Sequence, residues 1–313
     1  MIDVPASDSV DAYRQAARAA RVGIAANALL VVAKFVGGIV GHSTALIADA
    51  FHSLTDVVSS TGLAWSLRTA AKPADHDHPY GHGKVENIAA SVIAGFLLLV
   101  VIGISYGAWG RLQHPEELKG PTAIALVVAL LSIAVKEALF QYKFAIGRRL
   151  DSSSLIAEAW HHRSDAFSSI AATLGIGGAI AGGERWRVLD PIAAFVVAGI
   201  MAVMAVSIFR RSTLELMDTQ VPPETLEGIR RAAAAVPGVL LVETIHARKS
   251  GLNILVEIHI EVDDHMTVRE SHRLGHEVED RIRRDVPRVE RVLVHIEPHH
   301  EASQEGRRPI QAQ

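Results

Sequence analysis

The stretch ALIADAFHSLTDVVSS, residues 45–60, sets two polar side chains of defined spacing in an apolar background. His52 and Asp56 are four residues apart, so on a helix both project from one face, one turn from each other. A carboxylate near the middle of a bilayer costs roughly 2.5 to 3.5 kcal/mol on insertion scales, so it rarely lies there without a partner or a function. We therefore interpret His52 and Asp56 as a pair of metal ligands on a membrane-spanning helix.

The same spacing recurs in AEAWHHRSDAFSS, residues 157–169, where His161 precedes Asp165 by four positions. Two such helix faces together supply two imidazoles and two carboxylates, a set that suits tetrahedral zinc. His162 points about 100° away from His161 on a helix and is left out of the site. The alternative is that each pair is structural, and the repetition of one spacing on two apolar helices argues against it.

Six segments are long and apolar enough to span a bilayer as helices, which takes roughly 20 residues. They are residues 22–40, 44–67, 85–109, 122–145, 155–181 and 189–209. Most basic residues near the ends of these segments fall on one side, which places both termini in the cytoplasm. The first twenty residues are polar and lack the apolar core of a cleavable signal peptide.

Composition limits the classes of function. The chain has 313 residues, is 49% hydrophobic and carries a formal net charge of -3, which excludes a disordered chain and gives no sign of nucleic-acid binding. It contains no cysteine, so disulfides and thiolate metal sites are excluded, and metal ligands must be His, Asp or Glu.

From about residue 212 the composition becomes that of a soluble domain. We predict a helix from Pro222 and Pro223 to residue 236, strands at 239–248 and 252–262 joined by residues 249–251, a helix at 267–285 and a strand at 289–296. This α-β-β-α-β order predicts a cytoplasmic α+β domain of ferredoxin-like or metallochaperone-like type. The predicted organisation is a cytoplasmic segment (1–20), an all-α six-helix transmembrane domain (21–211), this cytoplasmic domain (212–298), for which the family resemblance described below implies metal binding and dimerisation, and a disordered tail (299–313).

Two further groups of ligand residues leave alternatives open. The loop AAKPADHDHPYGHGK, residues 70–84, carries Asp75, His78 and His82, which form either a second metal site or part of a solvated loop. The C-terminal domain has spaced histidines and one acidic residue that share a site or, alternatively, are unrelated surface residues: His246, His259, His272, His295 and Glu297. His295 and Glu297 project from one face of their strand because side chains alternate with period two.

Motifs of enzymes fail on inspection. His276-Glu277 begins like a zinc-protease signature, but the fifth position is Asp280. Gly83-Lys84-Val85 lacks the Ser or Thr of a phosphate loop, and the glycines of residues 175–183 do not fit a dinucleotide fingerprint. Those glycines are expected to be points of close helix packing, and we do not expect an enzyme.

Together, HSLTD, HHRSD, the DHDHPYGHGK loop and the spaced histidines resemble the cation diffusion facilitator family of divalent-metal transporters, from about residue 14 to residue 298. The resemblance implies a homodimer with six membrane helices per protomer. It implies a central transport site, a loop site and a cytoplasmic dinuclear site. These are, in turn, His52, Asp56, His161 and Asp165; Asp75, His78 and His82; and His246, His259, His272, His295 and Glu297. It also implies a charge pair of Lys84 and Asp218 that links protomers near the membrane surface.

The His52 position indicates the zinc-preferring type, because members with broader metal use often have Asp there. The chain is thus expected to be a multi-pass protein of the plasma or inner membrane that exports zinc in exchange for protons. Iron, manganese, cadmium or cobalt are alternative substrates, and a non-transporting metal sensor or scaffold is an alternative function. A membrane hydrolase is disfavoured, since four protein ligands leave no open metal position and no general-base Glu lies beside either pair.

Overall fold

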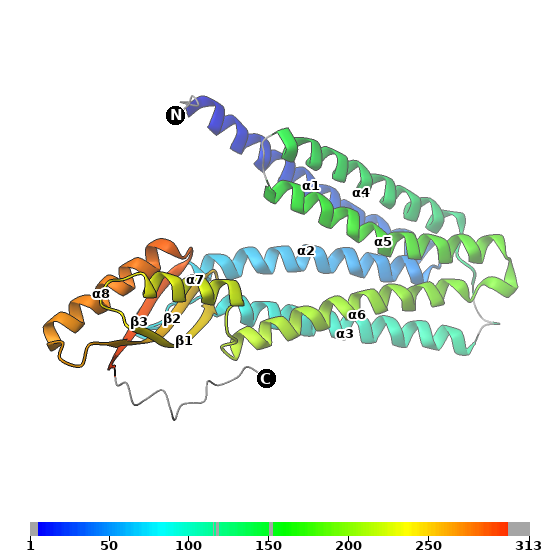
Figure 1. The fold of residues 1–313 in the computed structure, drawn as a ribbon. Helices are drawn as coiled ribbons and strands as arrows, with labels where there is room; N and C mark the ends of the chain where they lie inside the picture. The colour runs from blue at the N-terminus through cyan, green and yellow to red at the C-terminus, as the bar shows by residue number, and fades with distance from the viewer. Residues whose placement is uncertain (1–5, 115, 117–118, 150–152, 300–313) are drawn as a thin grey trace. The chain divides into compact units, whose positions relative to one another are not determined.

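The computed structural model describes residues 6–114, 116, 119–149 and 153–299. The chain divides into two compact units: residues 1–64 with 90–209, here the helical unit, and residues 65–89 with 210–313, here the mixed unit. Figure 1 shows the elements of both. We describe each unit by itself.

Six long helices correspond to the six predicted spans, and each includes most of its predicted segment. They are α1 (Ala6–Val40), α2 (Thr44–Ala70), α3 (Val85–Gln113), α4 (Ala123–Arg149), α5 (Ser153–Ala181) and α6 (Leu189–Leu216), with a short 3-10 turn, η2 (Glu184–Trp186), before α6. Helix α1 begins at Ala6, so the polar residues before the first predicted span are helical and continuous with it. Residues 1–5 lie outside the described part.

Four of the helical segments are apolar enough to cross a membrane by length and composition: Arg21–Val40, Val85–Gln113, Ala123–Arg149 and Glu184–Leu216. Helices α2 and α5 fall short of the same measure within the described residues. Each of these two helices carries one His/Asp pair, and these polar residues lower its mean hydropathy. Large apolar side chains such as Leu99 and Val203 are exposed on the other helices, as a lipid-facing surface requires.

The buried core of the helical unit lies at one end, where small side chains from α2, α3, α4, α5 and α6 meet. Gly175 of α5 shows how closely the backbones approach: a Cβ atom there would lie 2.2 Å from Ala193 Cβ and 2.9 Å from the Leu189 carbonyl oxygen of α6. The predicted close packing of the 175–183 glycines is thus confirmed at Gly175. Gly177 has no such neighbour, with its nearest atom at 3.8 Å.

A buried carboxylate ties the start of α2 to the start of α6. Ser43 Oγ donates to Asp190 Oδ1 at 2.5 Å, and the Thr44 N–H donates to Asp190 Oδ2 at 2.6 Å. The first N–H groups of a helix have no partner inside the helix, and in a membrane they cannot turn to water. Asp190 supplies that partner and so fixes where α2 begins.

The mixed unit contains the predicted α-β-β-α-β fold. Its elements are α7 (Pro223–Ala234), β1 (Leu241–Ser250), β2 (Asn253–Val262), α8 (Val268–Asp285) and β3 (Val289–Pro298). The sheet has the order β1-β2-β3, with β2 antiparallel to β1 and parallel to β3. The turn between β1 and β2 is shorter than predicted, because β1 continues to Ser250. The chain reverses at Gly251, which has a φ of 61°.

The two faces of this sheet differ. Alternate residues such as Ile258 and Ile260 are fully buried in a core that α7 and α8 complete, and both helices are labelled in Figure 1. The intervening residues, among them His259 and Glu297, project from the opposite face, here the open face, because strand side chains alternate. Residues 300–313, predicted to be a disordered tail, lie outside the described part.

Candidate metal centre

The central cluster joins α2 and α5 inside the helical unit. His52 and Asp56 come from α2 and Asp165 from α5, and one ligand atom of each lies within 4.8 Å of the other two. His52 is 2% exposed and Asp165 is 7% exposed. The predicted fourth ligand, His161, lies one turn before Asp165 on α5, but its side chain is outside the described residues. The three described donors converge as ligands of one small cation do.

Hydrogen bonds within each helix surround these ligands. Thr55 Oγ1 donates to the His52 carbonyl oxygen at 2.6 Å, and Ser168 Oγ donates to the Asp165 carbonyl oxygen at 2.8 Å. Such back-bonding satisfies hydroxyl groups in an apolar segment and is known to bend helices. Short polar side chains can therefore sit beside the ligands without an unpaired donor.

Further charges lie close to the cluster, and the sequence analysis missed them. Lys34 Nζ of α1 forms an ion pair with Asp49 Oδ2 of α2 at 2.7 Å, and both side chains are 0% exposed. Lys136 Nζ of α4 donates to the Asp165 carbonyl oxygen at 3.0 Å. A charged residue inside a predicted span is itself a sign of a function or a buried partner. That signal was present in the spans at 22–40, 44–67 and 122–145.

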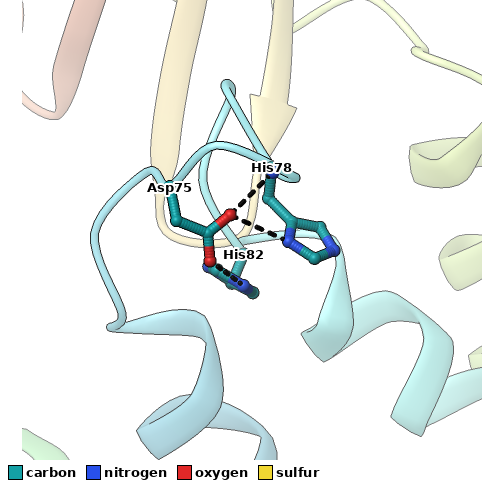
Figure 2. Close-up of side chains that lie close together, drawn as sticks. All are labelled: Asp75, His78 and His82. Carbon is teal, nitrogen blue, oxygen red and sulfur yellow. Dashed lines mark hydrogen bonds and ion pairs between the residues drawn. The ribbon is translucent and has the colours of Figure 1, made fainter.

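The loop cluster of the mixed unit brings together all three of its predicted residues. The His78 N–H donates to Asp75 Oδ1 at 2.7 Å, and His78 Nδ1 lies 3.1 Å from the same oxygen. His82 Nε2 lies 3.4 Å from Asp75 Oδ2. Figure 2 shows the carboxylate facing both imidazoles. Gly81, with a φ of 78°, makes the turn between the two histidines.

The electrostatics of this loop favour a cation. The hydrogen bond from the His78 N–H holds the pKa of Asp75 below its ordinary value, and the His78 ring adds to this effect. Asp75 therefore stays ionised at neutral pH. The loop is also held in place: a Cβ atom at Gly83 would lie 2.4 Å from the Ser250 carbonyl oxygen at the end of β1. The loop is therefore packed against the end of β1 and is not freely solvated.

The third cluster lies on the open face of the sheet. His259 Nδ1 of β2 lies 2.8 Å from Glu297 Oε1 of β3, and His295 Nε2 lies 3.7 Å from the same oxygen. Direct pairing of His259 with His295 in the parallel register explains why the two rings meet, with centroids 4.7 Å apart. The predicted shared face of His295 and Glu297 is confirmed.

The other two residues predicted for this site lie apart from it within one chain. His246 is on β1, where it pairs with Glu257 of β2, and it is exposed and lies outside the cluster. His272 is on α8, which covers the other face of the sheet. The sheet thus separates His272 from His259 and His295. Spacing along the sequence could not reveal this, because it does not say which face a helix covers.

One pair on the open face was not predicted. Glu261 is 5% exposed, and its Oε2 lies 2.6 Å from His299 Nδ1. Period-two spacing from His259 to Glu261 and from Glu297 to His299 could have found it.

The charge pair of Lys84 and Asp218 forms within a single chain. Lys84 Nζ donates to Asp218 Oδ1 at 2.9 Å, and Arg248 donates to Asp218 Oδ2 at 2.8 Å. The hydrogen bond from Lys84, followed by that from Arg248, lowers the pKa of Asp218. The pair therefore connects the start of α3 to the segment after α6 inside the mixed unit.

Comparisons with known proteins cover almost the whole chain. A family model described as the cation efflux transmembrane domain matches residues 20–217, and one described as the cation efflux protein, cytoplasmic domain, named ZT_dimer, matches residues 221–299. The first match alone covers more than half of the chain.

Individual relatives agree with this. Metal tolerance protein 2 of Oryza sativa subsp. japonica is 36% identical over 302 residues, covering 88% of this chain and 77% of that protein. Manganese efflux system protein MneP of Bacillus subtilis is 32% identical over 288 residues, covering 91% of this chain and 96% of that protein. Among solved structures, a cadmium form of a MamM CTD variant is 31% identical, covers 25% of this chain and 98% of that one, and has a TM-score of 0.25.

The matched models and relatives, together with the apolar helices and the buried ligands, describe a multi-pass membrane protein that moves divalent metal and is not an enzyme. The chain belongs to the cation efflux, or cation diffusion facilitator, family of divalent-metal transporters.

Proposed function

We propose that this protein exports zinc from the cytoplasm in exchange for protons, with the central cluster as its transport site. The observation that carries the proposal is the convergence of His52, Asp56 and Asp165 from two helices inside an apolar bundle. Two carboxylates neutralise the double charge of the ion, which lowers the cost of holding it at membrane depth. His161 is proposed as the fourth ligand because its spacing repeats that of His52.

Exchange follows from competition for the same side chains. A metal ion binds only when the imidazoles are neutral and the carboxylates ionised, so each bound metal excludes protons from its ligands. On the cytoplasmic side zinc displaces protons. On the other side protons displace zinc, and their return releases the site for another cycle.

Zinc is the proposed substrate because imidazole is a borderline ligand that suits zinc, whereas manganese prefers oxygen donors. Manganese is the second candidate, favoured by the 32% identity to a protein named as a manganese efflux system. Two of the three described central ligands are carboxylates, which manganese also accepts.

The other clusters are proposed to regulate transport and not to carry it. The loop cluster is partly exposed: the His78 and Asp75 side chains are 56% and 52% exposed to solvent. Its residues lie in a loop and not within a membrane-spanning helix. The open-face cluster is proposed to bind metal in a homodimer, which the ZT_dimer match supports. Both termini are proposed to be cytoplasmic, in a plasma or inner membrane.

A non-transporting sensor or scaffold is the rival function. Such a protein would need its surface sites and would not need a complete ligand set within its membrane helices. The buried position of His52 and Asp165 therefore favours transport.

The test is uptake of zinc, manganese, cadmium, iron and cobalt into proteoliposomes with an imposed pH gradient. We expect zinc to be taken up fastest, with proton flux in the opposite direction. Replacing Asp75, His78 and His82 together by Ala should leave measurable exchange. Manganese transport without zinc transport would contradict the proposed substrate, and metal flux that leaves the pH gradient unchanged would contradict the proposed coupling.

A further inference from the structure

Lys136 of α4 is a buried lysine beside the central cluster. It is 2% exposed, and its Nζ donates to the main-chain oxygen of Asp165 at 3.0 Å. Among the described residues, no carboxylate oxygen lies within ion-pair distance of this ammonium group. Burial of a charge without a counter-ion is costly, so its position calls for an explanation.

Lys34 provides the comparison, since it is equally buried in the same unit. Its Nζ contacts Asp49 Oδ2 at 2.7 Å and donates to Ser53 Oγ at 3.0 Å and Ser169 Oγ at 3.1 Å. An ammonium group has three donors, so these contacts fully satisfy it. Lys34 and Asp49 thus cancel each other's charge, and Lys136 is left with the charge of the ligand cluster.

The location of Lys136 places that charge where it affects the ligands. Its Nζ contacts Asp165, whose carboxylate lies within 4.8 Å of a ligand atom of His52 and of Asp56. A protonated lysine has no lone pair and cannot bind a metal ion. Its effect on the site is therefore that of a fixed positive charge.

The charges of the site can be added for its two states. Ionised Asp56 and Asp165 contribute two negative charges and Lys136 one positive charge, so the empty site carries one net negative charge. A bound dication leaves an excess of one positive charge in a medium of low polarity, where unbalanced charge is expensive. Without Lys136 the loaded site would be the neutral one.

We propose that Lys136 is a built-in counter-cation of the transport site, which offsets one of the two negative charges of Asp56 and Asp165 when no metal is bound and weakens metal binding. A carrier must release its ion as well as bind it, and Lys136 opposes the trapping of a dication by two buried carboxylates. Lys136 is held to α5 by its contact with the Asp165 main chain, so it stays with that half of the ligand set. This role rests on the proposed function of the central cluster.

The experiment measures zinc affinity of the full-length protein in detergent by competition with a chromophoric zinc chelator. The loop and open-face ligands are removed in the background used, by Ala at Asp75, His78, His82, His259 and His295. In that background Lys136→Gln should bind zinc at least about tenfold more tightly, because a repelling charge is lost. Lys136→Arg keeps the charge and should bind as the background does. A merely structural role would give weaker binding in Lys136→Gln.

Two controls make the result specific. The double change Lys34→Gln with Asp49→Asn removes an equally buried lysine together with its counter-charge, so it leaves the net charge unchanged and should not tighten binding. Ser132→Asp adds a carboxylate one turn from Lys136 on α4, keeps the lysine, and should tighten zinc binding by neutralising it. This second variant answers the question even if Lys136→Gln does not fold.

In flux assays Lys136→Gln should lower both KM and kcat for zinc, since tighter binding slows release. Unchanged or weaker zinc binding in both Lys136→Gln and Ser132→Asp would overturn the proposal, and so would equal tightening in the Lys34→Gln/Asp49→Asn double variant. Asp56→Asn in the same background tests the proposed site separately. If that variant still binds zinc as the background does, the site assignment fails whatever Lys136 does.

Discussion

At the scale of single residues, we propose different tasks for the three described central ligands. Asp56 and Asp165 supply the charge that offsets a dication, and His52 supplies a softer nitrogen donor. All three come from helices, so their separation is set by packing and not by a flexible loop. Charge should therefore decide whether metal binds, and His52 should decide which metal.

Replacing His52 by Asp gives the matching prediction. His52→Asp keeps a ligand at the position and makes the described set all-oxygen, which moves preference toward harder ions. Transport should continue, with the preference for zinc over manganese reduced by about tenfold or more. The measurement is uptake of both metals in competition by wild type and variant. An unchanged ratio of the two rates would show that His52 does not select the metal.

Some contacts between single residues could be predicted from the sequence, and others could not. The i, i+4 spacing predicted that His52 and Asp56 share one helix face, because helical periodicity fixes which side chains do so. That this face meets Asp165 was inferred from the repeat of the pair on a second apolar segment. The sequence could not predict that Lys136 contacts the carbonyl oxygen of Asp165, since that contact depends on which helix packs beside α5. The buried ion pair of Lys34 and Asp49 was missed for the same reason.

At the scale of elements, glycine sets how closely α5 and α6 approach. Gly175 is in contact with α6, whereas a Cβ atom at Gly177, two residues further along α5, would make only an ordinary van der Waals contact at 3.8 Å. Helix association in membranes depends on packing of small residues, because lipid provides no hydrophobic drive between helices. The two glycines therefore form a matched pair for a test of helix packing.

We expect Gly175→Ala to destabilise the helical unit by about 1–3 kcal/mol, because its Cβ would overlap Ala193 and α6 must shift. Gly177→Ala should be neutral, because ordinary van der Waals contact is all it would meet. Thermal unfolding of both variants in detergent, monitored by the fraction that remains monodisperse, measures the difference. Equal loss of stability in the two variants would show that Gly175 is not required for the close packing of α5 against α6.

The order and type of elements were predictable, because long apolar segments and alternating β-branched residues leave few alternatives. Their ends were less so. Helix α1 continues through polar residues to Ala6, which hydropathy does not report, and β1 reaches Ser250 because Gly251 and Leu252 suffice for the turn. The register between β2 and β3, which joins His259 to Glu297, comes only from the fold.

At the scale of the whole molecule, the described residues hold three predicted clusters of candidate metal ligands in two compact units, and exposed Asp263, Asp264 and His265 form a fourth such group. The central cluster is buried among the helices, and the other two lie in the mixed unit at greater exposure. We place transport at the central cluster and regulation at the other two. His246 and His272 stay predicted ligands, and within one chain they do not reach the open-face cluster.

The most direct test of this account is the initial rate of zinc flux in Asp56→Asn and Asp165→Asn, each reconstituted at equal protein density. Either change strips one of two charges from a site that must neutralise a dication, so flux should fall to the background of empty vesicles. Asp190→Asn is the matched control: Asp190 is 2% exposed and binds Ser43 and Thr44, away from the ligands, so flux per folded protein should persist. Wild-type flux in Asp56→Asn or Asp165→Asn would contradict the assignment of the transport site.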